Sequence, residues 1–292
     1  MPFRSILLAL TLVCGSPALA QFAGEHPTVV KLYPNGAPGS QARRNEPEQA
    51  QDYWVKNVHD PSLTIYPADP AHANGASVVV LPGGGHGLLV IEGEGVKAAQ
   101  ALNRMGITVA VLKYRLAREP GSTYTIEGDA AGDTARAIKW MRAHASDYKI
   151  DPARIGLMGF SAGGELASLV ANYPKEYAKA PRDALSKVSG RPDFQVLVYP
   201  GPLGAKGPIA PGAPPAFLVA GSKDRCCGPP TVTIYQLLHK AGVSAELHMY
   251  AGTDHGFNMD RSNLYSVAHW ADRLFEWLSD NGWLDRNGKR QN

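Results

Sequence analysis

Short apolar runs alternate along the chain with longer segments in which apolar residues recur every three or four positions. Continuous aliphatic runs are typical of strands buried on both faces, and the three-to-four spacing is typical of helices. The predicted strands are 63–66, 77–81, 108–112, 155–158, 194–199, 216–220 and 245–250. The predicted helices are 94–105, 129–144, 165–171, 232–241 and 267–279.

This alternation predicts an α/β fold, with a mostly parallel central sheet and helices on both faces. In such sheets, ligands bind at the carboxyl ends of the strands. Residues that directly follow a predicted strand are therefore the first candidates for a functional site.

The first 20 residues have the pattern of a signal peptide. Arg4 supplies the basic region, Ile6 to Val13 the apolar core, and Ala18-Leu19-Ala20 the small residues of a cleavage site. The apolar core is too short to span a bilayer. We therefore expect an exported protein whose mature chain starts near Gln21.

Residues 21–292 are enough for one α/β domain with a large core. Residues 21–60 are rich in Pro, Asn, Gln and Gly and predict an extended N-terminal arm. The net charge is only +3, and both signs are scattered. The sequence contains no basic run that would favour nucleic acid as a partner. It also contains no basic amphipathic helix that would favour a membrane.

A serine between two glycines links a predicted strand to a predicted helix, in Gly159-Phe160-Ser161-Ala162-Gly163. This is the nucleophile-elbow pattern, in which a sharp turn exposes the serine oxygen. Glycines flank the serine because strand and helix must approach closely. The helix N-terminus also directs its N–H groups toward the reacting carbonyl. The pattern predicts Ser161 as a nucleophile.

A serine hydroxyl needs a base, and the base needs an orienting acid. His255 lies in a glycine-flanked loop after the last predicted strand, and Asp224 follows the strand before it. The chain order serine, aspartate, histidine is that of the α/β-hydrolases. Two other acids are weaker candidates, because Asp254 adjoins the histidine and Asp193 precedes a strand.

Acyl transfer also requires donors for the developing oxyanion. The backbone N–H groups of Gly84, Gly85 and Ala162 are the candidates, and His86 in the same loop could contact substrate. A plain tight turn is the alternative for the triple glycine. A phosphate-binding loop is less favoured because no lysine follows with the required spacing.

The sequence predicts no metal and no organic cofactor. Its nine histidines include neither an HxH pair nor an HExxH motif. Cys226 and Cys227 are the two cysteines left after processing, and they are adjacent. A vicinal disulfide, two free thiols and an intermolecular bridge all remain open.

On these motifs the chain resembles α/β-hydrolase esterases of the acetyl-xylan-esterase type, which are related to the hormone-sensitive-lipase-like esterases. The matching stretches include 32–39, 81–86, 111–116, 150–156, 159–167, 191–194 and 245–248. The resemblance implies Ser161 as nucleophile, His255 as base and Asp224 as acid. It also implies Gly84, Gly85 and Ala162 as the oxyanion hole.

The resemblance further implies acetyl esters on plant-wall carbohydrate, such as acetylated xylan, as substrates. Two features depart from the family pattern. The loop Pro200 to Pro215 is shorter than the usual cap-bearing insertion, so we expect a minimal cap and an open cleft. Arg225-Cys226-Cys227 stands where relatives more often carry a Val-Pro step.

Other functions stay open at this point. A broad-specificity carboxylesterase or lipase fits the same motifs, and a prolyl-oligopeptidase-like peptidase is possible although no propeller domain is present. An inactive carbohydrate-binding homologue is the non-enzymatic alternative. Trp270, Trp277 and Trp283 are predicted to pack in the helical layer, with stacking on sugars as the alternative.

Overall fold

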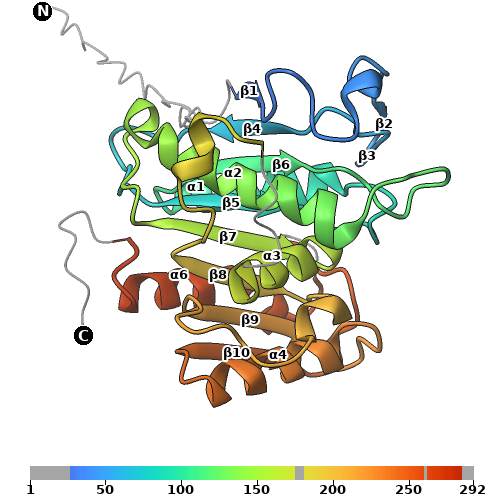
Figure 1. The fold of residues 1–292 in the computed structure, drawn as a ribbon. Helices are drawn as coiled ribbons and strands as arrows, with labels where there is room; N and C mark the ends of the chain where they lie inside the picture. Colours follow the sequence, from blue (N-terminus) through green and yellow to red (C-terminus); the bar gives the residue numbers. More distant parts are fainter. Residues whose placement is uncertain (1–26, 175–180, 260–261, 285–292) are drawn as a thin grey trace, which may run out of the picture.

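In the computed structural model, which describes residues 27–174, 181–259 and 262–284, eight strands form one central sheet (Figure 1). Their order across the sheet is β1-β4-β6-β5-β7-β8-β9-β10. The strands are β1 (Thr28–Lys31), β4 (Ser62–Tyr66), β5 (Ser77–Leu81), β6 (Thr108–Lys113), β7 (Ile155–Phe160), β8 (Phe194–Val198), β9 (Ala216–Gly221) and β10 (Ala245–Tyr250).

Every pairing from β6 to β10 is parallel, whereas β1 and β4 are antiparallel additions at one edge. The chain runs from β5 to β6 on one side and then crosses to β7 on the other side of β5. Such a change of direction opens a crevice at the carboxyl ends of the two central strands. The pairing of Leu81 with Gly159 places the loops after β5 and β7 side by side there.

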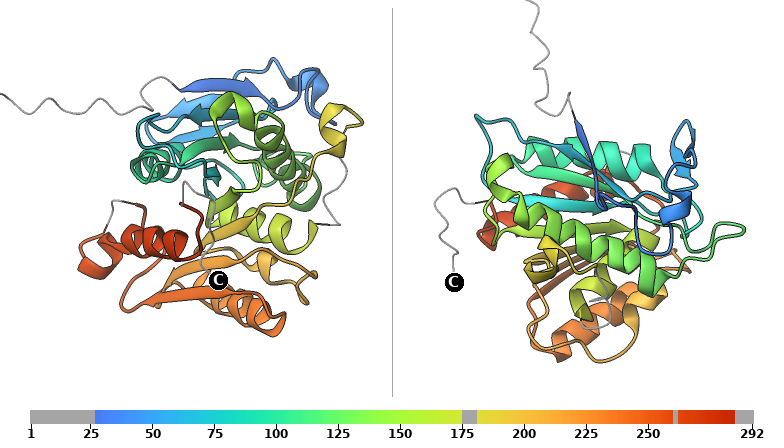
Figure 2. Two further views of the ribbon diagram at one scale, coloured as in Figure 1. Left: turned by 90° about the vertical axis from the view of Figure 1, so that its left-hand side faces the viewer. Right: turned by 45° about the horizontal axis from the view of Figure 1, so that its top comes forward.

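Helices cover both faces of the sheet (Figure 2). One buried cluster contains apolar side chains of α2, α3 and α4, and a second contains those of α1, α5 and α6. The helices are α1 (Lys97–Arg104), α2 (Ala131–Ala143), α3 (Ala162–Asn172), α4 (Gly228–Lys240), α5 (Tyr265–Ala268) and α6 (Trp270–Asp280). The predicted fold class is confirmed.

The central strands are buried along their whole length, as their continuous apolar sequences predict. Every residue of β5, β7, β8 and β9 is buried. The edge strand β10 is only half-buried, because no other strand of the described residues pairs with its outer side.

The N-terminal segment contributes more than an arm. Within the described part of 21–60, β1 pairs with β4, and β2 (Gln49–Gln51) forms a hairpin with β3 (Trp54–Lys56). These strands are three or four residues long and mostly exposed, so their sequences lack the apolar runs that marked the central strands. The predicted signal peptide lies outside the described residues.

The C-terminal tryptophans pack inside the molecule. Trp270, Trp277 and Trp283 are all buried. The Trp270 indole donates to the Asn258 carbonyl, while the other two indoles contact the Phe194 ring. The packing prediction therefore holds, and these indoles have no free face for a sugar. Within the described ranges, no helix has both the length and the apolarity that a bilayer crossing requires.

Candidate active site

The elbow between β7 and α3 holds Ser161 in an unusual backbone conformation, with φ +49° and ψ −116°. Its amide donates to the Val198 carbonyl on the neighbouring strand. A Cβ at Gly163 would lie 2.0 Å from the Leu81 carbonyl oxygen, and one at Gly159 would lie 2.1 Å from the Gly163 oxygen. Only glycine fits these two positions, so the sequence pattern follows from the close approach of strand and helix.

Three side chains from separate loops form a continuous series of contacts with Ser161 at one end. His255 Nε2 lies 2.9 Å from Ser161 Oγ, and His255 Nδ1 lies 2.6 Å from Asp224 Oδ2. If Nδ1 carries the ring hydrogen and donates to the carboxylate, Nε2 is left as the acceptor for the serine hydroxyl. This arrangement can deprotonate the serine as its oxygen attacks.

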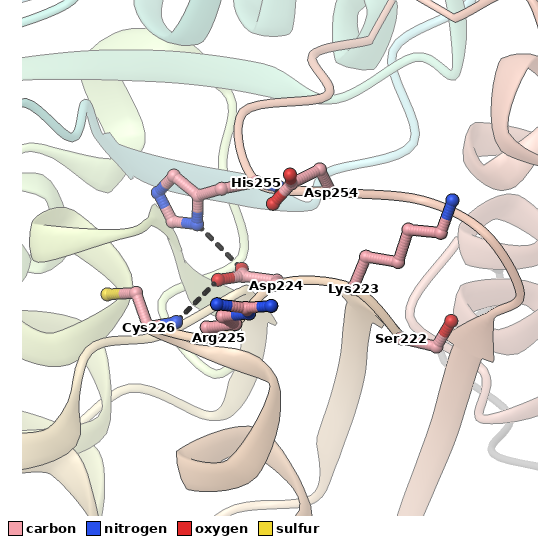
Figure 3. Close-up of a pocket in the computed structure, with 7 residues that line it drawn as sticks. All are labelled: Ser222, Lys223, Asp224, Arg225, Cys226, Asp254 and His255. Atoms are coloured by element: carbon pink, nitrogen blue, oxygen red, sulfur yellow. Dashed lines mark hydrogen bonds and ion pairs between the residues drawn. The ribbon is translucent and has the colours of Figure 1, made fainter.

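Asp224 is buried and held from two directions. Its second oxygen, Oδ1, accepts hydrogen bonds from the backbone amides of Cys226 at 3.1 Å and Cys227 at 2.9 Å. Figure 3 shows the carboxylate between the imidazole of His255 and the Cys226 amide. The loop after β9 therefore fixes the orientation of the carboxylate toward the ring.

The two weaker acid candidates lie elsewhere. Asp254 accepts from the backbone amide of the adjacent His255, not from its ring. Asp193 accepts from Arg142 and from the Ile155 amide, at the start of β7, which is the opposite end of the sheet. The structure brings Asp224, and neither of these residues, to the imidazole.

Cys226 and Cys227 are joined by a disulfide, which is one of the three possibilities that the sequence left open. Cys226 is exposed and Cys227 is buried. Both amides donate to the Asp224 carboxylate, so the disulfide restrains the two residues that orient this carboxylate.

A cleft of about 840 Å³ lies beside His255 (Figure 3). No extended cap appears between β8 and β9, where the described chain holds only the short helix η8 (Pro202–Ala205). The cleft is lined mainly by charged and hydroxyl-bearing residues, namely Ser222, Lys223, Asp224, Arg225, Cys226, Asp254 and His255.

Comparisons with known proteins show which proteins this chain is similar to. The BD-FAE family model matches residues 63–194. An acetylxylan esterase of Xylanibacter ruminicola is 30% identical over 222 residues, 64% of this chain and 42% of that relative. An ethyl acetate hydrolase of Pseudomonas putida is 30% identical over 162 residues, 54% of this chain and 46% of that relative. The chain thus spans less than half of each of these two relatives.

Solved structures extend the comparison to nearly the whole fold. The acetyl ester-xyloside bifunctional hydrolase of Caldicellulosiruptor lactoaceticus is 26% identical and superposes with a TM-score of 0.70, over 91% of this chain and 100% of that one. The chain has the α/β-hydrolase fold and is similar to carboxylic-ester hydrolases. The esterase Est2 of Thermogutta terrifontis, 22% identical with a TM-score of 0.68 over 82% of this chain and 95% of that one, shares the fold.

In this fold, the triple-glycine loop lies directly against Ser161. A Cβ on Gly83 would be 2.9 Å from Ser161 Cβ. Gly84 and Gly85 have φ of +123° and +64°, values that suit glycine. Among the described residues, no hydrogen bond engages either N–H, and Ala162 begins α3, where helix N–H groups lack intrahelical partners. The three predicted oxyanion donors are therefore free to bind an incoming group.

His86 does not have the position that the sequence predicted for it. Its side chain is 1% exposed, and Nε2 lies 2.6 Å from Glu165 Oε2 on α3. A side chain this buried has no surface to offer a substrate, so we correct its assignment from substrate contact to a link between loop and helix. Glu165 also accepts from the Leu203 amide in η8.

Three buried residues around the site escaped the sequence analysis: Glu94, Glu165 and Tyr199. Glu165 occurs one turn after Ser161, and Tyr199 directly follows β8 at the carboxyl edge of the sheet. Glu94 is an acid within a helical apolar pattern. In each case, the sequence signal that could have identified the residue was a polar side chain at a position predicted to be buried.

Proposed function

We propose that this chain is a serine esterase that removes short acyl groups, chiefly acetyl, from carbohydrate. The series of contacts from Ser161 through His255 to Asp224 supports this proposal most directly. No other group of three side chains near a strand end in the described ranges combines a nucleophile, a base and an orienting acid. The similarity to acetylxylan esterase and to ethyl acetate hydrolase supports the same class of reaction.

In the proposed reaction, Ser161 Oγ attacks the ester carbonyl carbon while its proton passes to His255 Nε2. The N–H groups of Gly84, Gly85 and Ala162 bind the oxyanion, and Asp224 stabilises the imidazolium. The C–O bond to the alcohol then breaks, and the alcohol oxygen takes the proton from Nε2. A water molecule deprotonated by His255 hydrolyses the acyl-enzyme and regenerates the serine.

The carbohydrate part of the proposal is supported by two observations. The cleft beside His255 presents hydroxyl, ammonium, guanidinium and carboxylate groups, which can form hydrogen bonds with a hydroxyl-rich substrate. Two of the similar proteins carry acetylxylan or acetyl ester-xyloside in their names. Export by residues 1–20 would bring the enzyme to such a polymer.

A broad short-chain esterase is the second candidate, and the similarity to an ethyl acetate hydrolase favours it. Acetate release from acetylated xylan, acetylated pectin and acetylated simple sugars, compared with hydrolysis of ethyl acetate, separates the two candidates. Carbohydrate specificity predicts that kcat/KM is highest on one of the acetylated sugars. A preference for ethyl acetate would assign the broader function.

Ser161→Ala removes the nucleophilic oxygen and leaves the elbow backbone in place. We expect hydrolysis of p-nitrophenyl acetate to fall to the uncatalysed background while the melting temperature is retained. Ser146→Ala, which removes an exposed hydroxyl from the short helix η5 (Ala145–Tyr148) before β7, is the matched control and should keep activity. Turnover by a folded Ser161→Ala variant would contradict the proposal.

A further inference from the structure

Tyr199 occupies a constrained position beneath the proposed catalytic base. It follows β8, is fully buried, and has φ +37°, a value rare for a bulky side chain. Its ring lies 4.6 Å from the His255 ring and 4.9 Å from the Phe257 ring, measured between centroids. The phenol is therefore packed between the base and the residue two positions after it.

The Tyr199 hydroxyl connects two loops of the site through Glu94. Its oxygen lies 2.9 Å from the Phe257 carbonyl oxygen and 3.1 Å from Glu94 Oε1. The other carboxyl oxygen, Oε2, accepts from the Gly83 amide at 2.6 Å. These contacts link the loop that carries His255 to the triple-glycine loop.

The number of available protons constrains these contacts. A phenol has one hydrogen, and both a carbonyl oxygen and an ionised carboxylate only accept. If Glu94 were ionised, two acceptors would compete for one phenolic hydrogen in a buried environment. If Oε1 carries a proton, that proton is donated to Tyr199, Tyr199 donates to Phe257, and Oε2 accepts from Gly83. All three contacts are then satisfied.

The surroundings of Glu94 favour the protonated form. Its side chain is 5% exposed, within the π-helical turn η3 (Ile91–Val96), and no lysine or arginine forms an ion pair with it in the described chain. Burial raises the pKa of Glu94, and this effect exceeds the lowering by the Gly83 amide, Tyr199 and His255. The other titratable group facing it is Tyr114, which is also buried and donates to the Pro82 carbonyl.

We propose that Glu94 is a neutral carboxylic acid and that, with Tyr199, it forms a positioning pair that couples the oxyanion loop to the base loop. The inference rests on the proposed esterase function. If Glu94 is neutral, Asp224 is the negatively charged group that orients the imidazole. The Glu94 carboxyl group is separated from the imidazole by the Tyr199 ring. The pair holds Gly83 and His255 in a fixed relation without altering the charge next to the base.

Glu94→Gln tests the protonation state, because an amide presents one acceptor and one donor in the places of the neutral acid. We expect kcat/KM within about threefold of wild type and an unmoved acidic limb of its pH profile. If Glu94 were ionised, the substitution would remove a negative charge near His255 and shift that limb to lower pH. Such a shift would overturn the proposal.

Infrared spectroscopy of the resting enzyme gives a readout that does not depend on activity. The wild type minus Glu94→Gln difference spectrum at neutral pH should contain the carbonyl stretch of a protonated carboxyl group. Glu92→Gln, two residues away, is the control and should retain that band. Absence of this band from the wild-type spectrum would show that Glu94 is ionised and would refute the proposal. Activity retained by Ser161→Ala would instead refute the proposed esterase function, and it would not change the band.

Glu94→Ala and Tyr199→Phe test the positioning role. Each breaks the link between the loops, so we expect kcat to fall about tenfold or more with KM nearly unchanged, since displaced donors act mainly on the transition state. Glu94→Gln should restore the loss seen in Glu94→Ala. If Glu94→Ala does not fold, Tyr199→Phe carries the test alone. A folded variant with wild-type kcat and only a lower melting temperature would show a purely structural role.

Discussion

Single residues at the site are defined by the directions of their hydrogen bonds. Ser161 is held in a strained turn and meets His255 Nε2, while the opposite nitrogen of the ring meets Asp224. The carboxylate is needed to hold one tautomer of the imidazole, since the other tautomer would present a hydrogen to the serine where an acceptor is required.

Asp224→Asn should therefore impair the proposed reaction strongly, even though the side chain keeps its shape. An amide that donates toward Nδ1 selects the wrong tautomer, and we expect kcat to fall on the order of 10⁴-fold. The measurement is steady-state hydrolysis of p-nitrophenyl acetate. Asp254→Asn is the matched control, and equal effects of the two substitutions would move the acid away from Asp224.

At the scale of elements, the loop between β9 and α4 controls the acid. Its two adjacent cysteines donate their amides to one carboxylate oxygen, and the disulfide joins the same two residues. Motion of the backbone at these two cysteines would therefore also move the Asp224 carboxylate. The disulfide-bonded residues are thus in direct hydrogen-bond contact with the proposed catalytic acid.

Replacing both cysteines, in the Cys226→Ser/Cys227→Ser variant, should loosen this loop. We expect kcat to fall several-fold, about 2- to 10-fold, because small displacements of an orienting group are costly to the reaction. Reductant should lower wild-type activity and have no effect on the double variant. Thiol titration verifies the reduction. If the reduced wild type then has the same kinetics as the oxidised one, the disulfide does not contribute to positioning Asp224.

At the scale of the whole molecule, burial of an acid couples folding to pH. Burial raises the pKa of Glu94 in the folded chain above its ordinary value of 4.5. As pH rises through 4.5, the unfolded chain releases this proton while the folded chain keeps it. The contribution of Glu94 to stability is therefore greatest below about pH 4.5 and is lost as pH rises toward the folded pKa.

The free energy of unfolding of wild type relative to Glu94→Gln should consequently decrease as pH rises from about 4.5. The slope can reach about 1.4 kcal/mol per pH unit, which corresponds to one proton. Urea unfolding at a series of pH values measures it, with Glu92→Gln as the variant that should show no such trend. A difference that is constant or increases with pH would contradict the assignment.

The sequence by itself determined the α/β class, the central strands and the residues after them. These features are local, because continuous apolar runs and the glycines around Ser161 express strand burial and close backbone approach directly. The short strands β1, β2 and β3 were missed because pairing, not apolarity, stabilises them.

Only the tertiary structure decided which polar groups meet. It places Glu165 on His86, which removes that histidine from the cleft, and places Glu94 and Tyr199 between two loops of the site. The residues of each contact are 58 or more positions apart, except for Gly83 and Glu94. A buried polar side chain reveals its role only through its partner, and the partner is chosen by how the strands are ordered in the sheet.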